Sequence, residues 1–158
     1  MSAQLQRIAD AITRNAGWKS AIADEEGVYR FSLDGGLDFS LLSPENRTAI
    51  LLADLGPAPV QGMEDDELSR LASVAAAALK KRRSVFAVAE GRLELHRAFA
   101  MNGLSDAEAC AHTRDFLNDL AWWKRQVERS GTSGGSAPSS GSSPFSFNLG
   151  GWFSGGGF

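Results

Sequence analysis

Residues 29–55, YRFSLDGGLDFSLLSPENRTAILLADL, predict three consecutive antiparallel strands. Apolar and polar residues alternate through residues 29–33 and again through residues 37–41, which is typical of strands with one buried face. The Asp-Gly-Gly sequence at residues 34–36 predicts a tight turn, so the first two strands form a hairpin. Residues 48–55 are apolar at almost every position, which indicates a central strand covered on both faces.

Segments on either side of these strands show the periodicity of amphipathic helices. The first is residues 3–16, between a plausible N-cap at Ser2 and a plausible stop at Gly17. Residues 64–83 begin with four acidic and end with four basic residues, the arrangement that a helix dipole favours. A capping box that begins at Ser105 predicts a third helix extending to around Glu128.

A second hairpin lies between the last two helices. Residues 85–89 and 92–99 flank a short Glu-Gly turn, with Leu93 and Leu95 expected to face the core. The element order is therefore α-βββ-α-ββ-α. This order predicts an α+β fold with a mainly antiparallel five-stranded sheet and three helices. Strands and helices do not alternate one by one, so a doubly wound nucleotide-binding fold is not expected.

Composition divides the chain into two parts. The chain has 158 residues and a net charge of −3, and every charged side chain lies in residues 1–129. We expect these residues to form one domain with its own core. Residues 130–158 contain nine glycines and nine serines, which predicts a Gly/Ser-rich flexible tail. The tail ends in PFSFNLGGWFSGGGF, whose aromatic residues either remain unbound or dock on the domain or a partner.

Residues that carry chemistry are few. The single cysteine, Cys110, excludes an internal disulfide and a multi-cysteine zinc site. Cys110 and His112 are two positions apart on a predicted helix, where side chains do not face each other. No phosphate-binding loop of the GxxxxGK type is present. The acidic net charge gives no general footprint for nucleic acid. We therefore expect no enzyme activity, no metal and no cofactor.

Membrane and targeting signals are also not expected. The longest apolar run covers residues 49–53, whereas a membrane-spanning helix needs about 20 apolar residues. Charged residues interrupt the first seventeen positions, where a signal peptide would be uninterrupted and apolar. The sequence predicts a cytoplasmic protein.

Three local patterns in this order resemble the class I type III secretion chaperones, the Tir-chaperone (CesT-like) family. The first is TAILLADLGP at residues 48–57, a buried strand that ends in Leu-Gly before a proline-bearing loop. The second is VFAVAEGRLEL at residues 85–95, a late hairpin with a Glu-Gly turn. The third is DFLNDLAWWKRQV at residues 115–127, a last helix with tryptophan near its end. The tail departs from the family pattern, because these chaperones usually end soon after the last helix.

The resemblance implies a non-enzymatic cytoplasmic homodimer without a cofactor. It implies binding of the N-terminal region of a secreted effector, kept extended for export, with the secretion ATPase as a second partner. We expect client contacts through the first helix and the first hairpin, at Leu5, Ile8, Ile12, Leu37, Phe39 and Leu41. We expect the dimer interface on the second helix, at Leu68, Leu71, Ala72, Ala75, Ala76 and Leu79.

Two alternatives remain open at this stage. One is an adaptor subunit of a secretion apparatus that has no client of its own. The other is a small thioesterase of the hot-dog type, whose central helix would follow the first strand. Here a run of three predicted strands precedes that helix, and it carries no candidate catalytic carboxylate or histidine.

Overall fold

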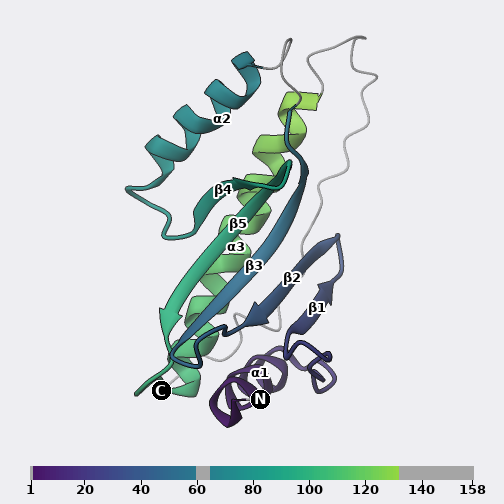
Figure 1. Ribbon diagram of the computed structural model, residues 1–158, viewed down its shortest axis with the longest axis vertical. Coiled ribbons are helices and arrows are strands. Elements are labelled where there is room, and N and C mark those ends of the chain that lie inside the picture. The colour runs from purple at the N-terminus through teal and green to yellow at the C-terminus, as the bar shows by residue number, and fades with distance from the viewer. Residues whose placement is uncertain (1, 60–64, 132–158) are drawn as a thin grey trace.

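The computed structural model describes residues 2–59 and 65–131 (Figure 1). It confirms the α+β fold with three helices and one five-stranded antiparallel sheet. The elements are α1 (Ala3–Ala16), β1 (Tyr29–Leu33), β2 (Leu37–Leu42), β3 (Thr48–Pro57), α2 (Asp65–Ala78), β4 (Val85–Ala89), β5 (Arg92–Ala100) and α3 (Asp106–Gly131).

The strand order in the sheet is β1-β2-β3-β5-β4, so β3 is central and β1 and β4 are the edges. Hairpins join β1 to β2 and β4 to β5, and every neighbouring pair is antiparallel. In the first turn, Gly35 and Gly36 have φ values of 85° and 72°. Side chains rarely adopt this conformation, which explains why two glycines occur there.

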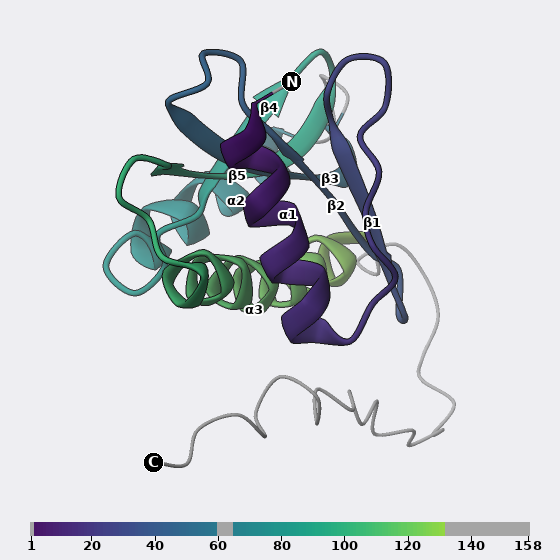
Figure 2. The same ribbon diagram turned by 90° about the horizontal axis from the view of Figure 1, so that it is seen from below.

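The helices α1 and α3 cover one face of the sheet (Figure 2). The alternate residues of the strands that face α3 form the core together with the apolar stripes of both helices. The α1 helix crosses the N-terminal half of α3, where the Cys110 thiol lies 3.5 Å from the carbonyl oxygen of Ala11. At the other side of α1, the Tyr29 hydroxyl donates to Oε1 of Gln6 at 2.7 Å. The core thus lies between the sheet and these two helices.

The opposite face of the sheet differs from the prediction. Along β3, residues Ala49, Leu51 and Ala53 are buried, but the alternate residues Ile50 and Leu52 are only half-buried. The strand with apolar residues on both of its faces is central in the sheet, as predicted. However, no helix among the described residues packs over its second face.

Helix ends follow the local sequence at two of the three helices. Gly17 ends α1 in the left-handed conformation with φ of 70°, and Ser105 and Glu108 form the predicted capping box of α3. The second helix is shorter than predicted: α2 ends at Ala78, and no basic residue lies in its last turn. The basic run at residues 80–83 belongs to the connection between α2 and β4 instead.

The boundary of the domain was predicted at residue 129, and α3 continues to Gly131. The predicted flexible tail with its aromatic end lies outside the described residues, so its division from the domain stays a prediction.

Candidate functional site

Several exposed apolar side chains lie on α2, directly after it, and on the edge strand β4. Leu79 is 66% exposed, and Val85 and Val88 are 54% and 50% exposed. We call these three residues, with the exposed residues Leu68, Ala72 and Ala76 of α2, the α2–β4 surface. Exposed apolar patches of this kind mark protein-binding sites. An edge strand beside such a patch adds unpaired backbone groups that can extend the sheet into a partner.

Five of the six residues predicted for the dimer interface are accessible, four on α2 and Leu79 directly after it. Leu68, Ala72, Ala76 and Leu79 are exposed, and Ala75 is half-buried. Leu71 differs, because it is buried in the core at 1% exposure and anchors α2 to the domain. A second anchor is Arg70, whose guanidinium donates to the carbonyl oxygen of Gln126 on α3 at 2.9 Å. The helix therefore stays attached through one side while its opposite side remains accessible.

The six residues predicted to contact a client lie in the core of the domain. Their exposed fractions range from 0% to 7% for Leu5, Ile8, Ile12, Leu37, Phe39 and Leu41. The residues of α1 face α3 and the sheet, and those of β2 face the helices. Direct contact of these side chains with a client remains a prediction, and it would require them to become exposed.

The segment beside β1 offers an accessible surface next to that core. Only one backbone bridge, between Ala23 and Tyr29, covers the outer edge of β1 in the described chain. Ile22 precedes this bridge and is 87% exposed. We call Ile22 and the outer edge of residues 30–33 the β1-edge surface. An edge strand of this kind can pair with an extended peptide.

Asp24 stabilises the loop that connects Ile22 with the start of β1. Its carboxylate accepts hydrogen bonds from the backbone amides of Val28 and Glu26 and pairs with Arg30 at 3.1 Å. These interactions, with the Val28 amide foremost, hold the pKa of Asp24 below its usual value. The carboxylate is therefore ionised at neutral pH, and the loop keeps its shape beside the strand.

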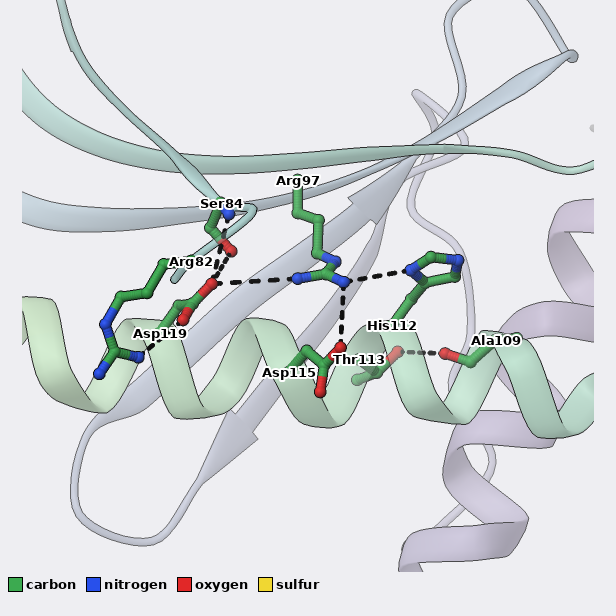
Figure 3. A network of polar contacts seen from close by, with 8 residues as sticks. All are labelled: Arg82, Ser84, Arg97, Ala109, His112, Thr113, Asp115 and Asp119. Atoms are coloured by element: carbon green, nitrogen blue, oxygen red, sulfur yellow. Dashed lines mark hydrogen bonds and ion pairs between the residues drawn. The ribbon is translucent and has the colours of Figure 1, made fainter. Parts of the chain in front are cut away.

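A network of polar side chains lies between β5, α3 and the α2–β4 connection (Figure 3). Arg97 is the centre of this network and is only 5% exposed. Its guanidinium lies 3.1 Å from an Asp115 oxygen, 3.3 Å from Nδ1 of His112 and 3.9 Å from an Asp119 oxygen. The period-two alternation of β5 places residue 97 on the inner face beside Leu95, so the strand pattern already contained this signal.

Asp119 connects the network to the basic connection. One carboxylate oxygen accepts from Arg82 at 2.8 Å, and the other accepts from the hydroxyl of Ser84 at 2.6 Å. The backbone amide of Ser84 donates to the same second oxygen. Arg82 also lies over the ring of Trp122, 4.4 Å from its centroid. The basic run thus has a specific role, because one of its arginines fastens the connection to α3.

The candidate nucleophile and base do not form a catalytic pair. The Cys110 thiol contacts the backbone of α1, and burial raises its pKa above the usual value. The His112 ring stacks on Phe99 with centroids 4.6 Å apart, and burial, together with the charge of Arg97, lowers its pKa. Asp115 and Glu108 oppose that shift in pKa. A protonated thiol and a neutral imidazole in separate contacts suit packing rather than catalysis.

Within residues 2–59 and 65–131, no group of three or more potential ligand side chains gathers to hold a metal ion. None of the helices in those ranges combines the length and apolar character that crossing a membrane requires.

Comparison with known proteins points to one family. The model of the Tir chaperone protein (CesT) family matches residues 7–124. No curated protein sequence matches the chain.

Solved structures share the fold at low sequence identity. A chain of the ExsC–ExsE complex is 20% identical, with a TM-score of 0.63 over 80% of this chain and 96% of that one. A chain of the HopA1–SchA chaperone–effector complex is 16% identical, with a TM-score of 0.63 over 78% and 95%. A chain of the heterodimeric ExoU–SpcU complex, from the type III secretion system of Pseudomonas aeruginosa, is 18% identical. Its TM-score is 0.57 over 77% and 98%.

Proposed function

Because this chain belongs to the Tir chaperone protein (CesT) family, we propose that it is a type III secretion chaperone that binds a secreted effector. The family match over residues 7–124 is the observation that carries this proposal. The chaperone keeps the N-terminal region of the effector extended until export. Loading must precede export, so the complex forms in the cytoplasm, and the secretion ATPase is its expected second partner. Chaperone–effector complexes among the structures of similar fold support this proposal.

The client docks on the β1-edge surface. An extended segment that pairs with β1 would gain backbone hydrogen bonds without requiring the sheet to rearrange. Ile22 lies beside that edge and is 87% exposed. It therefore offers an apolar contact without any core residue having to become exposed. Leu37 and Phe39 on β2 lie directly beside this edge strand, because their paired residues across the ladder are Leu33 and Phe31.

Purification of the tagged chain from its source cells should bring down one secreted protein in a fixed ratio. Deleting the chain should prevent secretion of that protein. Ile22→Asp should reduce the recovered client about tenfold, because a charge on the apolar contact must be desolvated when the client binds. The amount of client is measured by quantitative mass spectrometry against the tagged chain.

Ala111→Asp on the exposed side of α3 is the matched control and should leave client recovery unchanged. Equal recovery with Ile22→Asp would move the client away from the β1-edge surface. Recovery of apparatus subunits without a secreted protein would contradict the chaperone function and favour an adaptor. Hydrolysis of acyl-CoA by the pure chain would favour the thioesterase alternative.

The chain forms a homodimer through the α2–β4 surface. Leu79 directly follows α2 and Val85 begins β4, so the proposed surface combines residues at a helix end with residues of a sheet edge. In a twofold dimer the same surface meets itself, which suits a segment without charged residues from Ala72 to Leu79. Five of the six predicted interface residues are accessible for this contact.

Leu79→Glu should convert the dimer into a monomer at tens of micromolar protein. Each copy would lose a leucine contact of about 1.5–3 kcal/mol, and the twofold axis counts the loss twice. The dissociation constant should therefore rise about 100-fold or more. Light scattering on a sizing column measures the mass.

Ile22→Glu is the control for this experiment, because it places the same charge on an exposed isoleucine far from α2 in sequence. It should leave the mass of the dimer unchanged. A monomeric wild-type chain at the same concentration would remove the proposed interface.

A further inference from the structure

A pocket of about 280 Å³ lies where the α2–β4 connection meets α3. Lys81, Arg82 and Arg83 contribute from the connection, and Arg97 contributes from β5. The side from α3 is formed by Asp115, Asn118 and Asp119. We call this the corner pocket. Four of its lining residues, Arg82, Arg97, Asp115 and Asp119, belong to the polar network in Figure 3.

The corner pocket is positively charged although the chain is acidic overall. Four basic side chains and two carboxylates line it, which gives a formal charge of +2 against −3 for the whole chain. His112 does not add to this charge at neutral pH, because burial and Arg97 lower its pKa. A local excess of positive charge in an acidic protein concentrates anions at that place.

The carboxylates that line the pocket are already engaged. Both oxygens of Asp119 accept hydrogen bonds, from Arg82 on one side and from Ser84 on the other. One oxygen of Asp115 accepts from the buried Arg97. These contacts fix the two arginines in place, so the cationic floor of the pocket is built before any ligand arrives.

Two basic residues of the corner pocket remain available to bind an anion. Lys81 and Arg83 are exposed and have no ion pair within residues 2–59 and 65–131. They flank Arg82 on a connection that the Arg82–Asp119 pair, at 2.8 Å, holds against α3. The Arg83 guanidinium can bind a carboxylate through two parallel hydrogen bonds, and the Lys81 ammonium adds a second positive charge beside it.

We propose that the corner pocket binds the carboxylates of an acidic segment of a protein partner. The tail of this chain is not the occupant, because residues 130–158 contain no acidic side chain. A nucleic acid fits less well, because the exposed carboxylate of Asp115 lines the pocket and would repel a continuous row of phosphates. The β1-edge surface and the α2–β4 surface do not include these residues, so this inference is independent of the proposed client and dimer.

Binding of an acetylated and amidated hexaglutamate peptide to the full chain tests the proposal, with hexaglutamine as the neutral peptide. Isothermal titration calorimetry at low salt should show binding of hexaglutamate alone. Lys81→Gln combined with Arg83→Gln should weaken it about tenfold or more, since rim charges set the attraction. In the wild-type chain, the amide resonance of Ser84 should shift, because it donates to Asp119 in the pocket.

The matched control is Lys19→Gln combined with Arg47→Gln, which removes the same charge at exposed positions elsewhere. It should change the affinity less than twofold. Equal weakening by the two double variants would show attraction by net charge and overturn the proposal. So would equal binding of hexaglutamine, no binding of hexaglutamate at millimolar concentration, or tighter binding of inorganic phosphate or polyuridylate than of hexaglutamate.

Discussion

Asp119→Ala is expected to lower the free energy of unfolding by about 3–5 kcal/mol, the usual cost of removing one partner from a buried charged pair. The carboxylate is buried, as are Arg97 and Ser84 beside it. Without it, the guanidinium of Arg82 and the hydroxyl of Ser84 lose their acceptors, and Arg97 loses one of its two carboxylates. A buried donor without a partner forfeits its hydration and regains nothing. Urea denaturation followed by circular dichroism measures the change.

Asp119→Asn is the graded variant, because the amide keeps one acceptor oxygen while it removes the charge. It should cost less than Asp119→Ala. Asp38→Ala on the exposed face of β2 is the control and should change stability by less than about 0.5 kcal/mol. If Asp119→Ala also cost less than about 1 kcal/mol, the network would not hold the α2–β4 connection to α3.

Trp123→Ala is expected to lower the free energy of unfolding by about 3–5 kcal/mol through the cavity that it leaves. Trp123 is among the largest fully buried side chains, at 1% exposure. Its ring stacks on Phe86 of β4 with centroids 4.3 Å apart and planes 14° apart. This contact ties the edge strand to α3, so the loss should also expose β4. Thermal unfolding followed by circular dichroism measures the loss, and hydrogen exchange at residues 85–89 reports on the strand.

Trp123→Phe separates the contribution of ring packing from the cost of burying the unpaired indole N–H. The indole N–H of Trp123 is buried and has no hydrogen-bond partner in the described part of the chain. Phenylalanine keeps an aromatic ring and removes that unpaired donor, so this variant should lose much less than Trp123→Ala. Trp122→Ala, at a half-buried neighbour, should also lose less. Similar losses for all three variants would contradict a specific role of the Trp123–Phe86 stack.

Much of the fold could be predicted from local sequence. The alternation in residues 29–41 and the glycines between the strands specify a hairpin, because a strand exposes alternate residues to opposite faces. The capping box at Ser105 and the glycine at position 17 specify helix ends through bonds that form within a few residues. The end of α2 was misplaced, because acidic and basic runs describe a favourable dipole and do not require the helix to extend between them.

The interaction surfaces could not be predicted in the same way, because the spacing of apolar residues does not show which face of an element is buried. The apolar stripe of α1, at Leu5, Ile8 and Ile12, has the same spacing as an accessible helix face, yet it is buried against the domain. From Leu68 to Leu79 the spacing is similar, but Leu71 is buried and Leu79 is exposed. The predicted client residues and dimer residues were therefore derived from the same kind of signal, yet all six client residues are buried and only Leu71 of the dimer residues is buried.

The sequence by itself determined the order of the elements, the hairpins and the helix caps, because each depends on contacts between residues close in the chain. Only the tertiary structure decided which apolar stripe became core and which stayed at the surface. It also decided that Arg97 lies beside Asp119, two residues brought together from β5 and α3. Burial and long-range pairing depend on what the rest of the chain places opposite a residue, and periodicity records only the side on which a residue lies.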